Sequence, residues 1–591
     1  MAMSEFTHDQ PETFSRTAPL SSVLTIEVAL YAALAIVALF LRFFLLGNAP
    51  LAADEARQAL AAWNFVRGIP DPFTGSPLLF TGNAIVFFFF GATDAAARVV
   101  PALFGSALVF IPTLLRRELG RTGALIASLL LTLSPSLIFF SRNDNGAILA
   151  VTCALAAVAF AWRYLNDNTS RDLQFAAMSS ALALLAAREV WTIVVAIAIF
   201  ALIMRTRFAL PAESKSDWRR AAILFLIVSA GVGTTFALHR EGIGAAFDLL
   251  GAWLGGLQPS IALSDPLRLL VVYEPIALFI GVAAMIQLAF AARPDEQTQL
   301  PLGALSLWFV VGFVLYSIGA DKNPARVVVL VAPLTLVAGW YIGEWIENFL
   351  PSISSQVLLV QELPIYALAC AAAGFLYLIL ADFATRGSFI AADVIANATG
   401  LKNGAGLVIV AMIVVVIAAV AFLMVITLGW ARARDVGLAI ALTLFGLWTI
   451  RQSAMLNYAQ ALNPREFLVA RAPSPNVRDL VNDLQDTSRW RANDSYTLNI
   501  MADESLGAVV AWNLRDFRNL KFAAHPTSQN AQALILPPNA PAPASGWMSQ
   551  VYWLETSRTA TPNPSLLRWL MFRDVGEIGF DSAVLWIPQP K

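Results

Sequence analysis

The sequence predicts a multi-pass α-helical membrane protein that carries a small α/β domain at its C-terminal end. Hydrophobic residues make up 58% of the 591 residues and charged residues only 13%, whereas soluble globular proteins carry about 25% charged residues. So few charges cannot cover the water-facing surface of a chain of this length, and long apolar runs recur along most of it. The chain is therefore expected to lie largely in lipid.

The other totals exclude several classes of function. The formal net charge is −1, from 39 basic and 40 acidic residues, and this balance provides no basic field for nucleic acid. The two cysteines, Cys153 and Cys370, lie inside apolar runs and are expected to be small buried hydrophobic residues. The three histidines, His8, His239 and His525, are far apart and suggest no zinc cluster.

The membrane-spanning part is predicted to cover residues 23–451. Residues 1–22 are polar and are expected to be a disordered cytoplasmic tail. The run from Val23 to Leu46 is long enough to cross a bilayer and is expected to be a retained first span. About thirteen spans are predicted, and those after the first lie near residues 98–115, 122–141, 146–163, 173–187, 190–204, 220–238, 268–292, 302–319, 326–346, 357–381, 405–430 and 436–450.

The apolar segment Leu78–Phe90 is too short for an ordinary span. If it does not cross, three basic clusters lie on one side of the membrane, and the positive-inside rule makes that side cytoplasmic. These clusters are Arg116–Arg121, Arg205–Arg220 and Arg432–Arg434. The segment is therefore predicted to be a horizontal helix in an external loop of residues 47–97. The protein is expected in a prokaryotic plasma membrane, with its C-terminal domain outside.

Residues 452–591 are predicted to form an extracytoplasmic α/β domain, because they are richer in charge than the rest of the chain. Helical stretches are expected near residues 476–486 and 505–514. Short strand-like runs alternate with them, at Glu466–Ala470, Tyr496–Met501, Ala533–Leu536 and Val551–Leu554.

Two adjacent carboxylates, Asp54 and Glu55, follow the first span by a few residues. One interpretation is an ordinary helix start, where exposed N–H groups and the helix dipole favour acidic side chains. The other is a general base with an electrostatic partner at the membrane boundary, where partial desolvation raises the pKa of a carboxyl group. Their position alone leaves both interpretations open.

A second external turn, Ser141–Gly146, brings Arg142 and Asp144 to the same depth as the first pair. They are either parts of a tight polar turn or groups that orient a substrate. Asp54, Glu55 and Asp144 could also supply oxygen ligands for a divalent cation such as Mg²⁺ or Mn²⁺. No motif demands a metal, so this question stays open.

Four more cations are expected on the outer side of the membrane: Arg98, Arg188, Lys322 and Arg326. Each alone suits a snorkelling anchor at the interface. Together they could hold the phosphate of a lipid-linked substrate through charge-assisted hydrogen bonds. Charges are nearly absent from the middle of the predicted spans, which disfavours an ion-coupled transporter.

These segments together resemble the GT-C superfamily of polytopic glycosyltransferases, which use polyprenyl-phosphate sugars outside the cytoplasm. The resemblance covers most of the chain and runs through Asp54–Ala56, Asp94–Gly105, Arg116–Ala124, Leu133–Pro135 and Ser141–Asp144. Within the superfamily the chain is similar to the branch of protein O-mannosyltransferases and aminoarabinose transferases. It is most similar to a glycosyltransferase-like branch named "flippase activity-associated", through Asp321–Pro324, Ala332–Leu334, Gly339–Trp340 and Ala511–Asn519.

The resemblance implies inverting transfer of a sugar from a polyprenyl-phosphate donor to a glycan, lipid or protein acceptor at the outer membrane face. It implies Asp54 as the base with Glu55 as its partner, and Arg188 and Lys322 on the leaving phosphate with Arg98 close by. Relatives often carry a histidine before the short helix, where this chain has Thr74–Leu78. Two alternatives are therefore kept: a lipid-linked sugar translocase or accessory protein, and an inactive scaffold that recruits an enzyme or binds glycan.

Overall fold

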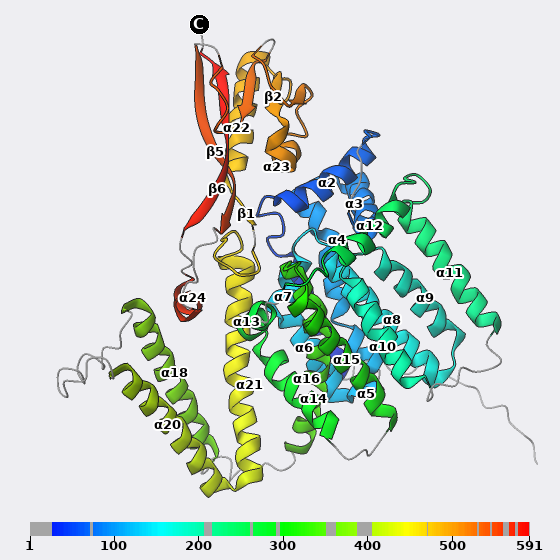
Figure 1. The fold of residues 1–591 in the computed structure, drawn as a ribbon, viewed down its shortest axis with the longest axis vertical. Coiled ribbons are helices and arrows are strands. Elements are labelled where there is room, and N and C mark those ends of the chain that lie inside the picture. The colour runs from blue at the N-terminus through cyan, green and yellow to red at the C-terminus, as the bar shows by residue number, and fades with distance from the viewer. Residues whose placement is uncertain are drawn as a thin grey trace, which may run out of the picture.

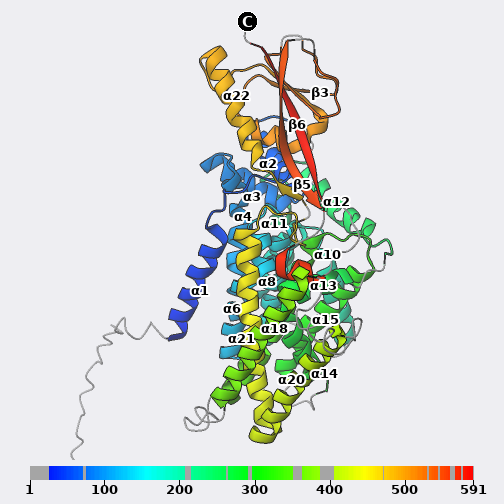
Figure 2. The ribbon, with the colours of Figure 1, turned by 90° about the vertical axis from the view of Figure 1, so that its left-hand side faces the viewer.

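The computed structural model shows a large body of helices with a smaller sheet domain at one end (Figures 1 and 2). It describes residues 26–70, 75–205, 215–260, 264–290, 296–349, 362–386, 405–469, 471–528, 531–543, 546–558, 566–573 and 577–589. The predicted disordered tail at residues 1–22 lies outside the described residues.

The first half of the helical body extends to residue 255. Its helices and 3₁₀ turns are α1 (Ile26–Phe43), α2 (Ala53–Val66), α3 (Pro77–Phe90), α4 (Asp94–Leu108), η2 (Ile111–Leu115), α5 (Arg116–Leu119), α6 (Arg121–Leu133), α7 (Pro135–Ser141), α8 (Ala147–Asp167), α9 (Ser170–Leu184), α10 (Val190–Met204), α11 (Lys215–Gly233) and α12 (Gly242–Gly255).

The second half begins after α12 and includes the most enclosed helix, α16, whose span is 89% buried. Because α16 is apolar on all sides, neighbouring helices can cover its whole circumference. The elements of this half are α13 (Ser264–Tyr273), η3 (Ile276–Ile280), α14 (Gly281–Phe290), α15 (Glu296–Ile318), η4 (Pro324–Arg326), α16 (Val327–Phe349), α18 (Leu363–Arg386), α20 (Ala405–Leu428), α21 (Trp430–Ala454) and η7 (Met455–Ala459).

Fewer helices than predicted have the length of a membrane span. Among the described residues, seven helices are long and apolar enough to cross, and nine if each of two bent helix pairs counts as one span. The predicted number of about thirteen is therefore not confirmed. α9 and α10 have 15 residues each, and at 1.5 Å per residue each is about 22 Å long, shorter than the ~30 Å hydrocarbon core. α3, with 14 residues, is shorter still.

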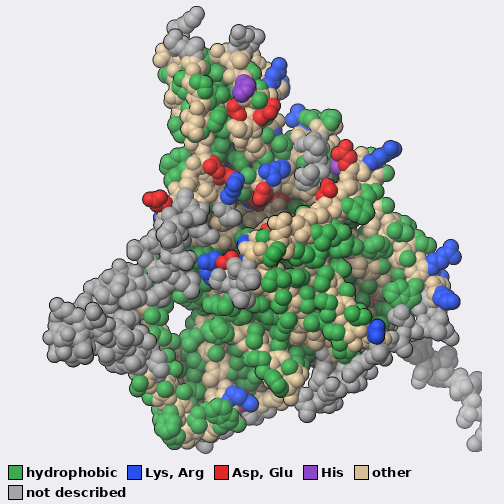
Figure 3. Space-filling model, in the orientation of Figure 1, with side chains coloured by type: hydrophobic (Ala, Val, Ile, Leu, Met, Phe, Trp, Pro, Cys, Tyr) green, Lys and Arg blue, Asp and Glu red, His purple; other side chains and the backbone are tan. Residues whose placement is uncertain are grey.

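Hydrophobic side chains cover most of the helical body on the face shown in Figure 3. Charged side chains on this face gather mainly on the sheet domain and where that domain meets the helices. This distribution agrees with a membrane protein whose polar chemistry lies at one end of its helices.

Two broken helices meet at a buried carboxylate. The axis bends by 60° between α6 and α7 and by 108° between α13 and the following helix. The carboxylate of Glu274, at the second break, accepts hydrogen bonds from the Ser134 hydroxyl at 2.6 Å and the Ser136 backbone N–H at 3.0 Å. Pro135 ends the first helix, because proline has no N–H to continue it.

The sheet domain has six strands in the order β1-β5-β6-β4-β2-β3. β2 pairs in parallel with β3 and β4, and the other pairs are antiparallel. Helices α22 (Asn476–Ala492) and α23 (Gly507–Asn513) contribute to the core of the sheet, and α24 (Leu566–Phe572) lies beside α18 (Figure 1). The strands are β1 (Arg471–Pro473), β2 (Ile500–Asp503), β3 (Leu520–Ala523), β4 (Ala533–Leu536), β5 (Trp547–Arg558) and β6 (Ile578–Pro588).

The predicted α/β domain is confirmed as a sheet domain, but the strand predicted at Glu466–Ala470 is wrong. Residues 466–469 form turns, Ala470 lies outside the described residues, and the first strand begins at Arg471. Glu466 is instead buried and accepts hydrogen bonds at 2.6 Å from the Tyr273 hydroxyl and from Nε of Arg573. This segment is apolar because it packs on the helical body, which local alternation does not reveal.

Candidate active site

A cavity of about 390 Å³ lies where the sheet domain meets the helical body. Four chain segments distant in sequence line most of it: residues 45–55, 139–145, 456–462 and 468–473. Its lining combines charged and polar side chains with apolar ones, among them Phe139, Phe140, Leu456 and Leu468. The cavity therefore suits a ligand that has both polar and apolar parts.

The buried carboxylate of Glu55 accepts four hydrogen bonds in this site. Its side chain is 11% exposed, and each carboxylate oxygen accepts two hydrogen bonds. Oε1 accepts from Nε of Arg98 at 3.0 Å and from the backbone N–H of Asp144 at 2.7 Å. Oε2 accepts from Nη2 of Arg98 at 2.7 Å and from the N–H of Ala52, which precedes α2, at 3.0 Å.

Arg98, on α4, uses its remaining donors on backbone carbonyls. Nη1 donates to Ala49 at 2.8 Å and to Leu46 at 3.2 Å, and Nη2 donates to Pro50 at 2.9 Å. A guanidinium has five N–H donors, and the bidentate pair with Glu55 uses the other two. Arg98 and Glu55 thus form a buried clamp that fixes residues 46–55 to α4, with no donor of Arg98 left for a phosphate.

Asp54 faces the opposite way from its neighbour. Its side chain is 95% exposed, and Oδ1 lies 3.3 Å from Nη1 of Arg57, one turn along α2. Asp54 lines the cavity. The two carboxylates therefore differ in environment: the buried one is held by four donors, and the exposed one is able to meet a reactant.

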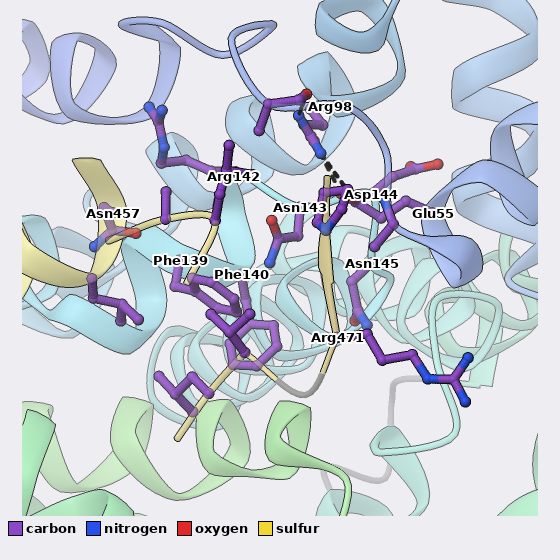
Figure 4. A pocket seen from close by; sticks show the side chains of 18 of the residues that line it. Glu55, Arg98, Phe139, Phe140, Arg142, Asn143, Asp144, Asn145, Asn457 and Arg471 are labelled. Atoms are coloured by element: carbon purple, nitrogen blue, oxygen red, sulfur yellow. Dashed lines mark hydrogen bonds and ion pairs between the residues drawn. The ribbon is translucent and has the colours of Figure 1, made fainter. Parts of the chain in front are cut away.

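The second predicted group, Arg142 and Asp144, also lines the cavity (Figure 4). Arg142 donates to carbonyls at the end of α1, the closest being Phe44 at 2.7 Å, and stacks on the ring of Tyr458 at 4.8 Å. Asp144 is 5% exposed, and its two oxygens accept from the amide of Asn83 at 2.9 and 3.1 Å. Burial raises the pKa of Asp144 well above its ordinary value.

The structure places the other predicted cations around Asp321. Arg188 and Arg326 donate to Oδ2 of Asp321, at 2.8 and 3.0 Å, and Lys322 donates to the carbonyl of Tyr316 at 3.1 Å. None of these three cations lines the cavity, although the next residues along the chain, Asn323 and Pro324, do. They form a separate cluster in the same region of the helical body.

The three carboxylates considered as metal ligands do not converge. Within the described part of the chain, no three His, Cys, Asp or Glu side chains form a group that could hold a metal ion. Glu55 is occupied by its four donors, the oxygens of Asp144 accept from Asn83, and Asp54 points to solvent. These three carboxylates therefore do not fit a metal centre.

Several lining side chains were not predicted from the sequence, and Arg471 and Asn457 are two of them. Arg471 is on β1, and its side chain is 61% exposed, with one long ion pair of 3.7 Å to Glu555. In Figure 4 it lies on the opposite side of the cavity from Arg98. Both residues belong to the segment treated as a separate external domain, so no sequence signal connected them with the loop that carries Asp54.

Polar contacts dock the sheet domain on that loop. Asp94 accepts from Nε1 of Trp512 at 2.8 Å and from Arg478 at 3.0 Å. The N–H of Ala53, in the first turn of α2, donates to Oε1 of Glu555 at 2.6 Å. The exposed helix start that carries Asp54 is therefore held from both sides, by the clamp and by β5.

We expect the stability of the folded protein at this docking contact to fall as the pH rises, because the ionised Glu555 carboxylate is partly buried. Burial raises the pKa of the Glu555 carboxyl, although the Ala53 N–H and Arg471 favour its charged form. A carboxyl group whose pKa is higher in the folded protein than in the unfolded chain contributes its full stabilisation below the unfolded-state pKa, which is about 4.3 for glutamate. That stability is lost as the pH rises through the folded value. Glu555→Gln keeps an acceptor for Ala53, so its melting temperature should gain on that of the wild type as the pH rises above the unfolded value of about 4.3. A constant difference across this range would contradict the proposed titration.

The chain is similar to one protein family and to several solved structures. The family model described as dolichyl-phosphate-mannose-protein mannosyltransferase matches residues 75–233. In sequence comparison, no curated protein matches the chain. The crystal structure of ArnT from Cupriavidus metallidurans bound to undecaprenyl phosphate is similar over 95% of this chain and 99% of that chain, with 15% identity and a TM-score of 0.56.

Two further structures are similar to the chain. ArnT from the same organism in the apo state has 15% identity and a TM-score of 0.53, over 87% of this chain and 94% of that chain. Archaeal oligosaccharyltransferase AglB from Archaeoglobus fulgidus has 12% identity and a TM-score of 0.48, over 86% of this chain and 69% of that chain. The ArnT likeness and the family match confirm the predicted resemblance: the chain has the fold of GT-C glycosyltransferases.

Proposed function

We propose that the protein transfers a sugar from a polyprenyl-phosphate donor to an acceptor at the outer face of the membrane, with inversion at the anomeric carbon. The observation that carries this proposal is the cavity itself. Its lining includes the exposed carboxylate of Asp54 together with apolar side chains such as Phe139 and Phe140. The same fold in ArnT is known with undecaprenyl phosphate bound, a ligand with one charged and one apolar end.

In the proposed reaction Asp54 is the general base. The acceptor hydroxyl oxygen forms a bond to the anomeric carbon, and the bond from that carbon to the phosphate oxygen breaks. The hydroxyl proton passes to Asp54, and the polyprenyl phosphate leaves with the bonding electrons. Glu55 does not exchange a proton in this scheme, because its oxygens are saturated; it positions Asp54 through the first turn of α2.

The charge that develops on the leaving phosphate needs a cation with free donors. Arg98 has none left, and Arg142 donates to the carbonyls that end α1. Arg471 lines the cavity, and its only ion pair with the described residues is the long one to Glu555. We therefore assign phosphate binding to Arg471, with Arg188, Lys322 and Arg326 as a more distant positive cluster.

Arg471→Ala is expected to lower kcat/KM for the lipid-linked donor by about 10–100-fold, because a charge-assisted hydrogen bond to the phosphate is lost. Arg471→Lys should recover part of this loss. Arg518→Ala is the matched control, since Arg518 is also an arginine of the sheet domain and is 73% exposed. Steady-state transfer rates at varied donor concentration check the expectation. Equal losses in both variants would contradict the assignment.

The function as a whole is tested by mass spectrometry of glycans and glycolipids from cells with and without the gene, followed by transfer assays. The assays use membranes supplied with undecaprenyl phosphate carrying mannose, glucose, galactose or aminoarabinose. A product that depends on the gene and on Asp54 supports the proposal. Binding of sugar lipids without transfer, and with no dependence on Asp54, would support the translocase alternative.

A further inference from the structure

A groove of about 520 Å³ lies on the sheet domain, between α22 and the two long strands β5 and β6. Among the described residues, it shares no lining residue with the cavity that contains Asp54. Figure 2 shows α22 beside these strands in the part of the molecule that projects away from the helical body. The groove is therefore a second candidate site for a ligand, and the proposed transfer reaction does not use it.

The walls of the groove follow from helix and strand periodicity. Asp483, Thr487 and Trp490 are four and three residues apart, so they lie on one face of α22. Gln550 and Tyr552 lie on one face of β5, because side chains alternate along a strand. One wall is thus a helix face and the other is a face of the sheet.

Two side-chain contacts hold α22 against the strands. The Tyr552 hydroxyl donates to the Asp483 carboxylate. Nη2 of Arg491 donates to the carbonyl of Pro588, at the end of β6, at 2.6 Å. Because these contacts fix the distance between the two walls, the groove is formed before any ligand arrives, and binding there requires little further ordering of the chain.

Trp490 brings a large aromatic ring to the surface of the groove. It is 71% exposed, whereas tryptophan is highly buried on average. Met548, which also lines the groove, is 50% exposed. The exposed Ser549 hydroxyl and Gln550 amide can both donate and accept hydrogen bonds. The groove therefore combines a flat apolar surface with neutral hydrogen-bonding groups.

The charged side chains at the groove balance among the residues that the structure describes. Asp486 pairs with Arg489 at 3.1 Å, and the other two charged side chains are Asp483 and Arg491. Two acids against two arginines leave no net charge that would attract either a cation or an anion. The balance favours a neutral ligand.

We infer that this groove binds a neutral oligosaccharide, with one sugar ring stacked on Trp490. A pyranose ring has an apolar face of C–H groups, which the negative face of an indole attracts, and it carries hydroxyls around its rim. These hydroxyls donate and accept, so they can bond to Gln550, Ser549 and Asp486. A phosphate would meet the carboxylates of the groove, and an acyl chain would leave its polar groups without partners. The inference goes beyond the proposed transfer reaction, because binding here requires no turnover.

The test measures binding of neutral hexasaccharides to the full-length protein in nanodiscs. The probes are α-1,6-mannohexaose, cellohexaose, maltohexaose and β-1,4-galactohexaose, and titration calorimetry gives the Kd of each. At least one of them is expected to bind with a Kd below about 1 mM. Trp490→Ala should weaken this binding about tenfold, and Trp490→Phe should weaken it less, because a phenyl ring also stacks.

Controls separate a contact with the sugar from a change in the fold. Trp553→Ala is the matched control, since Trp553 is 47% exposed and follows Tyr552 on β5, so that it lies on the opposite face of the strand; it should leave the Kd unchanged. Gln550→Ala should weaken binding about three- to tenfold. Asp54→Asn should bind the hexasaccharide as tightly as the wild type, so binding at the groove is tested separately from transfer.

The results that overturn the inference are distinct. They are the absence of any hexasaccharide with a Kd below about 1 mM, unchanged binding in Trp490→Ala, and equal losses in Trp490→Ala and Trp553→Ala. Tighter binding of a hexalysine peptide or a neutral Gly-Ser hexapeptide than of every hexasaccharide would make the groove a peptide site instead. Sugar binding that depends on Trp490, in a protein that shows no transfer, would uphold the inference while the proposed function fails.

Discussion

Replacing Asp54 by asparagine is expected to reduce sugar transfer by about 10²–10⁴-fold while leaving the protein folded. The amide cannot accept the proton that the acceptor hydroxyl loses, so the loss should appear in kcat. The fold should survive because the Asp54 side chain is 95% exposed and, among the described residues, forms one ion pair, with Arg57. Exposed substitutions of this kind change stability by about 0.5 kcal/mol or less. Transfer in purified membranes and melting temperature in detergent are the two measurements.

Two controls sharpen this prediction. Arg57→Gln removes the ion-pair partner of Asp54. It should change activity far less than Asp54→Asn, because Arg57 takes no part in the proposed proton transfer. Glu241→Gln replaces another exposed acid, at the start of α12, and should have no effect. Full transfer by Asp54→Asn, with a lipid-linked sugar supplied, would eliminate Asp54 as the base.

The different environments of Asp54 and Glu55 show which features of the site can be predicted from the sequence. Two adjacent acids predicted a helix start, and the structure confirms it, because Glu55 in the first turn of α2 accepts the N–H of Ala52. Asp54 lines the cavity, and its role as a general base stays a prediction. Which of the two is buried depends on Arg98, 43 residues further along the chain. Local sequence does not contain that contact.

The sequence predicts four cations as candidates for binding a phosphate, and the structure separates them by their partners. A cation is available to a ligand only if its donors are free, and this property follows from tertiary contacts. Arg98 is fully used, Arg188 and Arg326 share Asp321, and Arg471 is largely free. The bent helices were equally invisible to hydropathy, because the 60° break at Pro135 lies within one apolar run.

Removing the Arg98 guanidinium is expected to be the most damaging single change to stability. Arg98→Met leaves the Glu55 carboxylate buried without its cation and three backbone carbonyls without donors. Breaking one partner of a buried ion pair costs about 3–5 kcal/mol. We expect the variant to lose most of its folded, detergent-soluble population, measured by size-exclusion chromatography and by melting temperature.

A double variant distinguishes a clamp from a substrate cation. If Arg98 and Glu55 stabilise each other, the double variant Arg98→Met, Glu55→Gln should lose less free energy of unfolding than the two single variants lose together. The reason is that no uncompensated charge stays buried in the double variant. If Arg98 instead binds the donor phosphate, Arg98→Met should fold normally and raise the KM for the donor. Arg117→Met is the matched control, since Arg117 is 73% exposed and its only ion pair in the described part of the chain is with Asp167; its melting temperature should remain close to that of the wild type.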